Sequence, residues 1–247
     1  MKRFLPHYSI NLNNIILILS LLLFSAAGHA QERKLQNRPY IDERIWHWGF
    51  MVGLNVQDLA LSNSGLPAVV NGVPEYWYAD VDSYSPGFSV GLLGEIKLND
   101  YLAARLLPTI HFGDKMVMFR EQAGLESRQQ VIKSSYLSLP LDLKLSGERC
   151  NNWRPYVMAG IAPSLDLTVR TRQELLVRKL DCMLEVGFGM DYYYDFFKLI
   201  PELKFCFGLR DIIEKNRKDI NDASIIKYSN AVDGARSRMI VLSLYFE

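Results

Sequence analysis

The sequence contains only one long apolar run, and that run lies near its start. After residue 30, charged residues interrupt every apolar stretch, so no later segment reaches the about 20 apolar residues of a membrane-spanning helix. Neither sign of charge is in surplus, because 28 Lys and Arg stand against 27 Asp and Glu, spread evenly along the chain. Without a basic stripe or tail, we expect no nucleic-acid partner.

Cysteine and histidine are also scarce. The three cysteines, Cys150, Cys182 and Cys206, are odd in number and far apart, which favours buried or incidental thiols over a disulfide framework. No Cys or His pair has the spacing of a metal site. After residue 30 the only histidines are His47 and His111, neither with a catalytic Ser, Asp or Glu constellation beside it in sequence. We therefore expect no catalytic residue, cofactor, metal or small-molecule substrate, and interpret the protein as not an enzyme.

The single apolar run belongs to an export signal. Lys2 and Arg3 precede the apolar residues 15–24, and the segment ends on the small residues Gly28-His29-Ala30. This order is typical of a signal peptide, which predicts that residues 1–30 are removed by cleavage after Ala30. An uncleaved anchor is the alternative. The exported chain is then expected to be periplasmic, secreted or a membrane barrel.

Beyond this signal, apolar and polar residues alternate with a period of two, which is the pattern of β-strands with one greasy face. The clearest case places Leu137, Leu139, Leu141, Leu143 and Leu145 on one face. Strands are predicted at residues 46–57, 88–98, 102–112, 134–145, 155–169, 180–191, 198–210 and 238–247. About eight strands is the minimum for an outer-membrane barrel.

Alternation alone also fits a soluble barrel or a sandwich. The placement of loops and aromatic residues distinguishes these folds from a membrane barrel. Long loops are predicted at 58–87, 113–133 and 211–237, and shorter connections separate them, as in outer-membrane barrels. Aromatic residues collect at the strand ends beside the short turns and predict an interfacial girdle, with a core plug as the alternative. The predicted girdle comprises Trp46, Trp48, Tyr101, Trp153, Tyr192, Tyr193 and Phe246.

These features predict an all-β fold: an antiparallel, up-and-down transmembrane β-barrel of about eight strands in the outer membrane, with both termini on the periplasmic side and lipid as a partner. The signal peptide (1–30) is followed by a periplasmic segment (31–45) and one barrel domain (46–247). Charges of both signs on the second strand face predict a paired network that fills a narrow lumen, with a proton or ion path as the alternative. The network comprises Glu95, Lys97, Arg105, Asp142, Lys144, Asp166, Glu185, Glu202 and Lys204.

Four prolines conflict with this scheme, because a closed barrel has no edge where a missing N–H is harmless. Pro108, Pro140, Pro163 and Pro201 all fall inside predicted strands. We expect them to mark bulges or strand ends.

Several short segments resemble the PorT family of outer-membrane β-barrel proteins from Bacteroidetes. They occur in order between about Trp46 and Arg210: Gly49-Phe50-Met51-Val52-Gly53-Leu54-Asn55, Phe88-Ser89-Val90-Gly91-Leu92 with the following Leu-Asn-Asp-Tyr-Leu turn, Leu107-Pro108-Thr109-Ile110-His111-Phe112-Gly113, Arg154-Pro155-Tyr156 with Ala159-Gly160, and Pro201-Glu202-Leu203-Lys204-Phe205. The resemblance implies a part in the type IX secretion system, which moves folded cargo across the outer membrane and supports gliding in some members. Other secretion-system proteins are then expected as partners.

The alternative function is a structural or adhesive barrel of the OmpA/OmpX type that binds an external ligand through its long loops. The first long loop is rich in aromatic residues, which are favoured in binding surfaces. Its predicted contact surface comprises Tyr76, Trp77, Tyr78 and Tyr84.

Overall fold

The structure is a computed structural model that describes residues 36–65, 67–70, 73–121, 127–168, 178–213 and 232–247. The predicted signal peptide (1–30) and residues 31–35 of the expected periplasmic segment lie outside these residues. In the described ranges there is no helix with both the length and the apolar character to cross a membrane. The single helical element within these ranges is the 3-10 turn η1 (Ile41–Glu43).

In the part of the chain that the structure describes, thirteen strands follow this turn, and eleven of them form one sheet. In chain order they are β1 (Trp46–Asn63), β2 (Ala68–Val70), β3 (Val73–Glu75), β4 (Trp77–Tyr84), β5 (Pro86–Lys97), β6 (Leu102–Leu106), β7 (Thr109–Glu121), β8 (Ser127–Ser138), β9 (Leu141–Ser146), β10 (Trp153–Asp166), β11 (Leu180–Tyr193), β12 (Lys198–Gly208) and β13 (Val232–Phe246). β2 and β3 pair only with each other.

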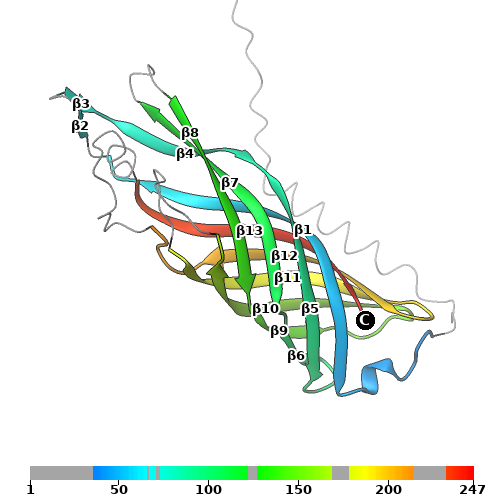
Figure 1. Cartoon of the computed structure of the whole chain (residues 1–247). Coiled ribbons are helices and arrows are strands. Elements are labelled where there is room, and N and C mark those ends of the chain that lie inside the picture. Colours follow the sequence, from blue (N-terminus) through cyan, green and yellow to red (C-terminus); the bar gives the residue numbers. More distant parts are fainter. Residues whose placement is uncertain (1–35, 66, 71–72, 122–126, 169–177, 214–231) are drawn as a thin grey trace, which may run out of the picture. The chain divides into compact units, whose positions relative to one another are not determined.

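The large sheet closes on itself through antiparallel neighbours (Figure 1). β1 pairs with β13 on one side and β5 on the other, and β10 pairs with β11. β4 and β5, β6 and β7, and β8 and β9 follow each other along the same path, so the chain crosses the wall about eight times. The predicted antiparallel, up-and-down barrel is confirmed.

Two prolines lie where the wall strands are interrupted, Pro108 between β6 and β7 and Pro140 between β8 and β9. The strand register is unchanged across these breaks. Each proline carbonyl still accepts a hydrogen bond from the neighbouring strand, from Leu92 N to Pro108 O at 3.0 Å and from Leu107 N to Pro140 O at 3.1 Å. Pro163 and Pro201 stay inside β10 and β12. Each proline therefore removes a donor without producing a bulge.

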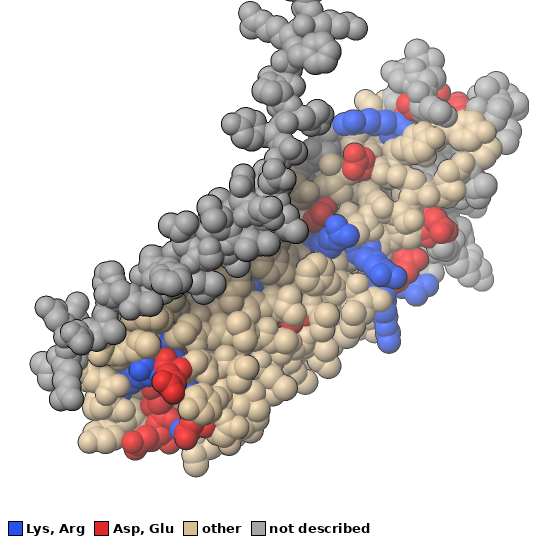
Figure 2. Space-filling model, turned by 180° about the vertical axis from the view of Figure 1, so that it is seen from behind, with Lys and Arg blue, Asp and Glu red and all other residues tan. Residues whose placement is uncertain are grey.

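Side chains alternate between an exposed apolar wall and a buried interior. On β1, Phe50 and Leu54 are exposed while Met51 and Asn55 are buried. The outward apolar run from Trp46 to Val56 matches the about 9–11 residues of a tilted transmembrane strand. Figure 2 shows the same division on one face, where the middle of the described surface is largely uncharged and charged groups gather toward both ends.

One end of the barrel carries the short turns after β5, β9 and β11 and is called here the short-turn end; the opposite end is called the extended end. The long loops expected at 58–87 and 113–133 are largely strand there, because β1 runs to Asn63, β4 fills 77–84, β7 runs to Glu121 and β8 begins at Ser127. Most of the third expected loop, 214–231, lies outside the described residues, although β13 already begins at Val232.

The strands extend because their alternation continues with the apolar face turned inward. Leu59, Trp77, Val117, Phe119 and Ile132 are buried at the extended end. Together with Ala79, Ile212, Ile213, Val232 and Ala235 they form a cluster, called here the outer apolar cluster. Burial of this face stabilises the strands beyond the apolar wall.

Candidate functional site

The centre of the lumen is organised around Glu202 of β12. Its carboxylate accepts hydrogen bonds at 2.7 Å from Arg105 Nη1 of β6, from Tyr156 OH of β10 and from Tyr245 OH of β13. The Arg105 guanidinium carbon also lies 4.9 Å from the centre of the Tyr245 ring. All four side chains are buried, so three donors share the charge of one carboxylate that has no contact with bulk water.

A second cluster surrounds the ammonium group of Lys204, two residues further along the same face of β12. Lys204 Nζ lies 2.7 Å from Glu185 Oε2 and 3.4 Å from Asp142 Oδ2. Gly160 lies opposite Asp142 in the β9–β10 pair, and a Cβ there would overlap the Asp142 carboxylate and the Leu141 carbonyl. The glycine therefore leaves the space that this acidic side chain occupies.

A third group of charges continues the network toward the short-turn end. Lys144 Nζ lies 2.8 Å from Asp191 Oδ2 and 3.4 Å from Glu95 Oε2. Lys198 Nζ lies 2.6 Å from Glu247 Oε2, whose other oxygen is 2.5 Å from His47 Nδ1. Burial raises the pKa of Glu247, but the Lys198 ammonium and the hydrogen bond with His47 outweigh burial and bring this pKa to about 2.

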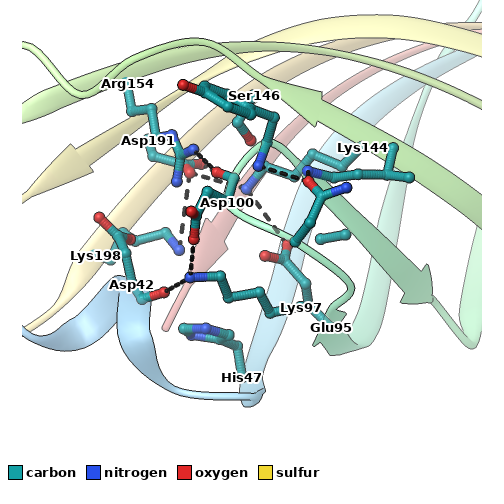
Figure 3. Close-up of a pocket in the computed structure, with 14 residues that line it drawn as sticks. Asp42, His47, Glu95, Lys97, Asp100, Lys144, Ser146, Arg154, Asp191 and Lys198 are labelled. Atoms are coloured by element: carbon teal, nitrogen blue, oxygen red, sulfur yellow. Dashed lines mark hydrogen bonds and ion pairs between the residues drawn. The ribbon is translucent and has the colours of Figure 1, made fainter.

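A small polar cavity lies at this end, between the third group of charges and the turn after β5 (Figure 3). Its volume is about 30 Å³, and its lining includes Asp42, Lys97, Lys144, Asp191 and Lys198. A buried water needs at least about 10–15 Å³ and several polar partners. The cavity suits one or two waters and is too small for a substrate.

The segment before β1 covers the short-turn end of the lumen. Asp42 of η1 accepts a hydrogen bond from Tyr193 OH at 2.9 Å and forms an ion pair with Arg149 at 3.2 Å. Asn37 N donates to Asn152 Oδ1 at 2.8 Å, and Ile41 is buried. These contacts anchor residues 37–43 across the end of the barrel.

Most of the residues assigned to the lumen network from sequence are buried: Glu95, Arg105, Asp142, Lys144, Asp166, Glu185, Glu202 and Lys204. Asp166 lies toward the extended end and accepts a hydrogen bond from Ser134 Oγ at 3.2 Å. Lys97 is instead at the rim of the barrel, because β5 ends there; its ammonium contacts Asp100 at 2.8 Å and its side chain is 27% exposed.

Sequence reasoning missed four members of this network, which are Asp191, Lys198, His47 and Glu247. Asp191 shares a strand face with Glu185 and Lys198 shares one with Glu202, so following the alternation to the strand ends identifies these two. His47 lies on the inward face of β1, a strand from which no residue was assigned to the network. Glu247 follows the end of β13 but is the last residue of the predicted strand 238–247, whose alternation places it on the inward face.

Of the seven residues expected in the aromatic girdle, six have exposed or half-buried rings and one is buried. Trp46, Trp48, Tyr101, Trp153 and Tyr192 are exposed at the short-turn end, and Phe246 is half-buried. The rings of Trp46 and Trp48 stack with centroids 6.1 Å apart. Tyr193 points into the lumen instead, because adjacent residues of a strand face opposite sides.

The expected contact surface is divided in the same way. Tyr76, Tyr78 and Tyr84 are exposed, whereas Trp77 is 2% exposed and belongs to the outer apolar cluster. Trp77 Nε1 donates to Glu75 Oε2 at 2.9 Å. β4 has replaced the expected loop here, so its alternation sends Trp77 inward.

His111 Nδ1 lies 2.7 Å from Ser89 Oγ, a contact between strands that sequence reasoning missed. Both side chains are buried inside the wall, and Asn55 Nδ2 donates to the same hydroxyl at 2.9 Å. Among the described residues, no group of His, Cys, Asp and Glu side chains is arranged to hold a metal ion. All three cysteines are free, with Cys206 buried and Cys150 exposed.

Residues 29–214 match the family model described as outer membrane protein beta-barrel domain. The chain belongs to this outer membrane β-barrel family. The match places the protein in the outer membrane, and in such barrels the short turns face the periplasm. A comparison with curated proteins finds no match.

Solved outer-membrane proteins are also similar to this β-barrel protein. The N-terminal β-barrel domain of Pseudomonas aeruginosa OprF is 15% identical, with 79% of this chain and 96% of that chain covered and a TM-score of 0.32. OprG from Pseudomonas aeruginosa is 15% identical, with 81% and 91% covered and a TM-score of 0.44. Neisserial surface protein A is 11% identical, with 79% and 95% covered and a TM-score of 0.38.

Buried side chains occupy the lumen of this outer membrane β-barrel protein at both ends and in the middle of its described part. Paired charges occupy the span of the apolar wall, and the outer apolar cluster occupies the extended end. Cations and anions in close contact are stabilised only while both partners remain. The arrangement therefore suits a rigid scaffold that presents its two ends.

Proposed function

We propose that this outer membrane β-barrel protein is a component of the type IX secretion system and is needed for the export of cargo proteins across the outer membrane. The observation that carries the proposal concerns the PorT-like segments. Tyr156 belongs to one of them, and Glu202 and Lys204 belong to another; all three meet in the lumen network. The resemblance therefore falls on residues that fix the interior of the barrel.

The filled lumen supports a role in which the protein acts through its surfaces rather than as a conduit. Its apolar wall contacts outer-membrane lipid, and other secretion-system proteins bind at its exposed ends. We further propose that it is not an enzyme, since the Ser89 and His111 side chains are 1% and 4% exposed and offer no access to a substrate. Nucleic acids and small-molecule substrates are not among the proposed partners.

The test is to delete the gene and measure, by fractionation, whether cargo accumulates inside the cell envelope. Accumulation with an intact outer membrane, reversed by the wild-type gene, is the expected result. Unchanged export would overturn the secretion role.

The second candidate is an adhesive barrel, favoured by the exposed rings of Tyr76 and Tyr78 at the extended end. Complementation with Tyr76→Ser/Tyr78→Ser separates the two candidates. A secretion component acting through its periplasmic end keeps export with this variant, whereas an adhesin loses surface binding. Tyr101→Ser, which removes an exposed ring at the short-turn end, is the control for the surface-binding assay.

A further inference from the structure

A groove of about 450 Å³ lies on the outside of the barrel where the apolar wall meets the extended end. Its floor and sides are apolar, formed by Val56 of β1, Phe205 and Phe207 of β12 and Ile240 of β13. Arg238 and Tyr84 border it on the side of the extended end, and Tyr84 is 66% exposed. Volumes of this size are in the range of small-molecule binding sites.

The groove forms where β4 separates from β1. The β1–β5 ladder ends at the Val56–Pro86 pair, and β4 pairs with β7 instead, with a shift of register between Val81 and Tyr84. Beyond that pair, Asp58 Oδ1 accepts the Leu59 N–H at 2.7 Å, and the Asn63 side chain bonds to both the N–H and the carbonyl of Ala79. In this part of β1, side-chain hydrogen bonds replace backbone pairing with a neighbouring strand. The ring of Tyr84 borders the groove that results.

Arg238 borders this groove, and a second arginine, Arg236, lies just beyond it on the same strand. Arg236 and Arg238 are two residues apart on the outward face of β13, and both are exposed. In the part of the chain that the structure describes, neither guanidinium has an ion pair or a side-chain hydrogen bond. Asp58 lies opposite Arg238 in the register and also lines the groove, and its carboxylate accepts a hydrogen bond from the Leu59 N–H.

We propose that this groove binds a phosphate-bearing lipid of the outer leaflet, with an acyl chain against Phe207 and Ile240 and a phosphate on Arg236 and Arg238. The position of the groove selects this occupant, because apolar residues below and cations above match the order of tails and headgroups in a leaflet. Guanidinium groups also form paired hydrogen bonds to phosphate oxygens. The lipid would hold the extended end at a fixed depth in the membrane.

The test uses the purified full chain in detergent micelles and native mass spectrometry. The probes are monophosphoryl lipid A and the same lipid with its phosphate removed. A basic residue near a membrane surface contributes about 1 kcal/mol toward an anionic lipid, so Arg238→Gln should weaken binding of the phosphorylated probe about fivefold and Arg236→Gln/Arg238→Gln about thirtyfold. Arg44→Gln, which removes an exposed arginine at the short-turn end, should leave binding unchanged.

A second variant tests the groove without changing charge. Ile240→Trp fills it from a lipid-facing position and should weaken both probes equally. Equal binding of the two probes to the wild-type chain would overturn the phosphate contact. It would also be overturned if Arg236→Gln/Arg238→Gln bound the phosphorylated probe as tightly as Arg44→Gln does. Displacement of the lipid by millimolar inorganic phosphate would overturn the assignment to a lipid, because free phosphate would then be the ligand.

Discussion

Removing the charge of Glu202 should destabilise the barrel more than any single surface change. Glu202→Gln keeps the shape of the side chain but leaves Arg105, which is 2% exposed, with Glu95 at 3.9 Å as its nearest remaining carboxylate. It also places an amide donor against the hydroxyl of Tyr156 or Tyr245, both of which now donate to Glu202. Breaking one side of a buried ion pair costs about 3–5 kcal/mol. We expect a loss of this size in the free energy of unfolding.

The measurement is a urea titration of the protein refolded in lipid vesicles, followed by tryptophan fluorescence, to which Trp46, Trp48 and Trp153 at the short-turn end and the buried Trp77 all contribute. Arg105→Met should also lower the free energy of unfolding. The double variant Arg105→Met/Glu202→Gln should lose at least about 1.5 kcal/mol less than the sum of the two single losses, because the effects of residues in contact are not additive. Glu148→Gln, in an exposed turn, is the control. Additive losses, or a Glu202→Gln loss below about 1 kcal/mol, would refute the idea that these groups form one unit.

Three further predictions concern the wall, the extended end and the short-turn end. Leu143→Arg, on the outward face of β9, should lower the free energy of unfolding in vesicles by about 2–4 kcal/mol, whereas Ser127→Arg at the extended end should not. Trp77→Ala should cost about 3–5 kcal/mol in the same titration, and its exposed neighbour Tyr78→Ala less than about 1 kcal/mol. The lowered pKa of Glu247, about 2, means that its carboxylate stabilises the folded state above its usual pKa and loses this contribution as the pH falls from about 4.5 to about 2. Glu247→Gln should therefore be less stable than wild type at pH 6, with the difference vanishing near pH 2.

The strand pattern could be predicted from the sequence because lipid imposes one rule on the whole wall. Outward positions between Trp46 and Val56 must be apolar, and the alternation that results identified β1 at its first residue. The same rule failed beyond Val56. There the apolar residues around Leu59 face inward. The segment therefore has no outward apolar face and was predicted to be a loop.

Ion-pair partners could not be predicted in the same way. Alternation places Arg105 and Glu202 on inward faces, but it does not say that β6 and β12 face each other across the lumen. That contact depends on closure of the sheet and on the register of every strand between them. The sequence therefore predicts which charged residues face the lumen, but the structure is needed to show which of them form ion pairs with each other.

The outer apolar cluster lowers the local dielectric around the ion pairs of the lumen. Phe119 and Ile132 have no exposed surface at the extended end, so water is kept from the ion pairs that lie beneath them. Electrostatic attraction is stronger where water is excluded, and an unpaired charge is correspondingly more costly there. At the opposite end, Asp42 and Tyr193 close the lumen next to the small polar cavity. A barrel whose charges are shielded at both ends resists opening as a pore, and this favours a function carried out by its surfaces.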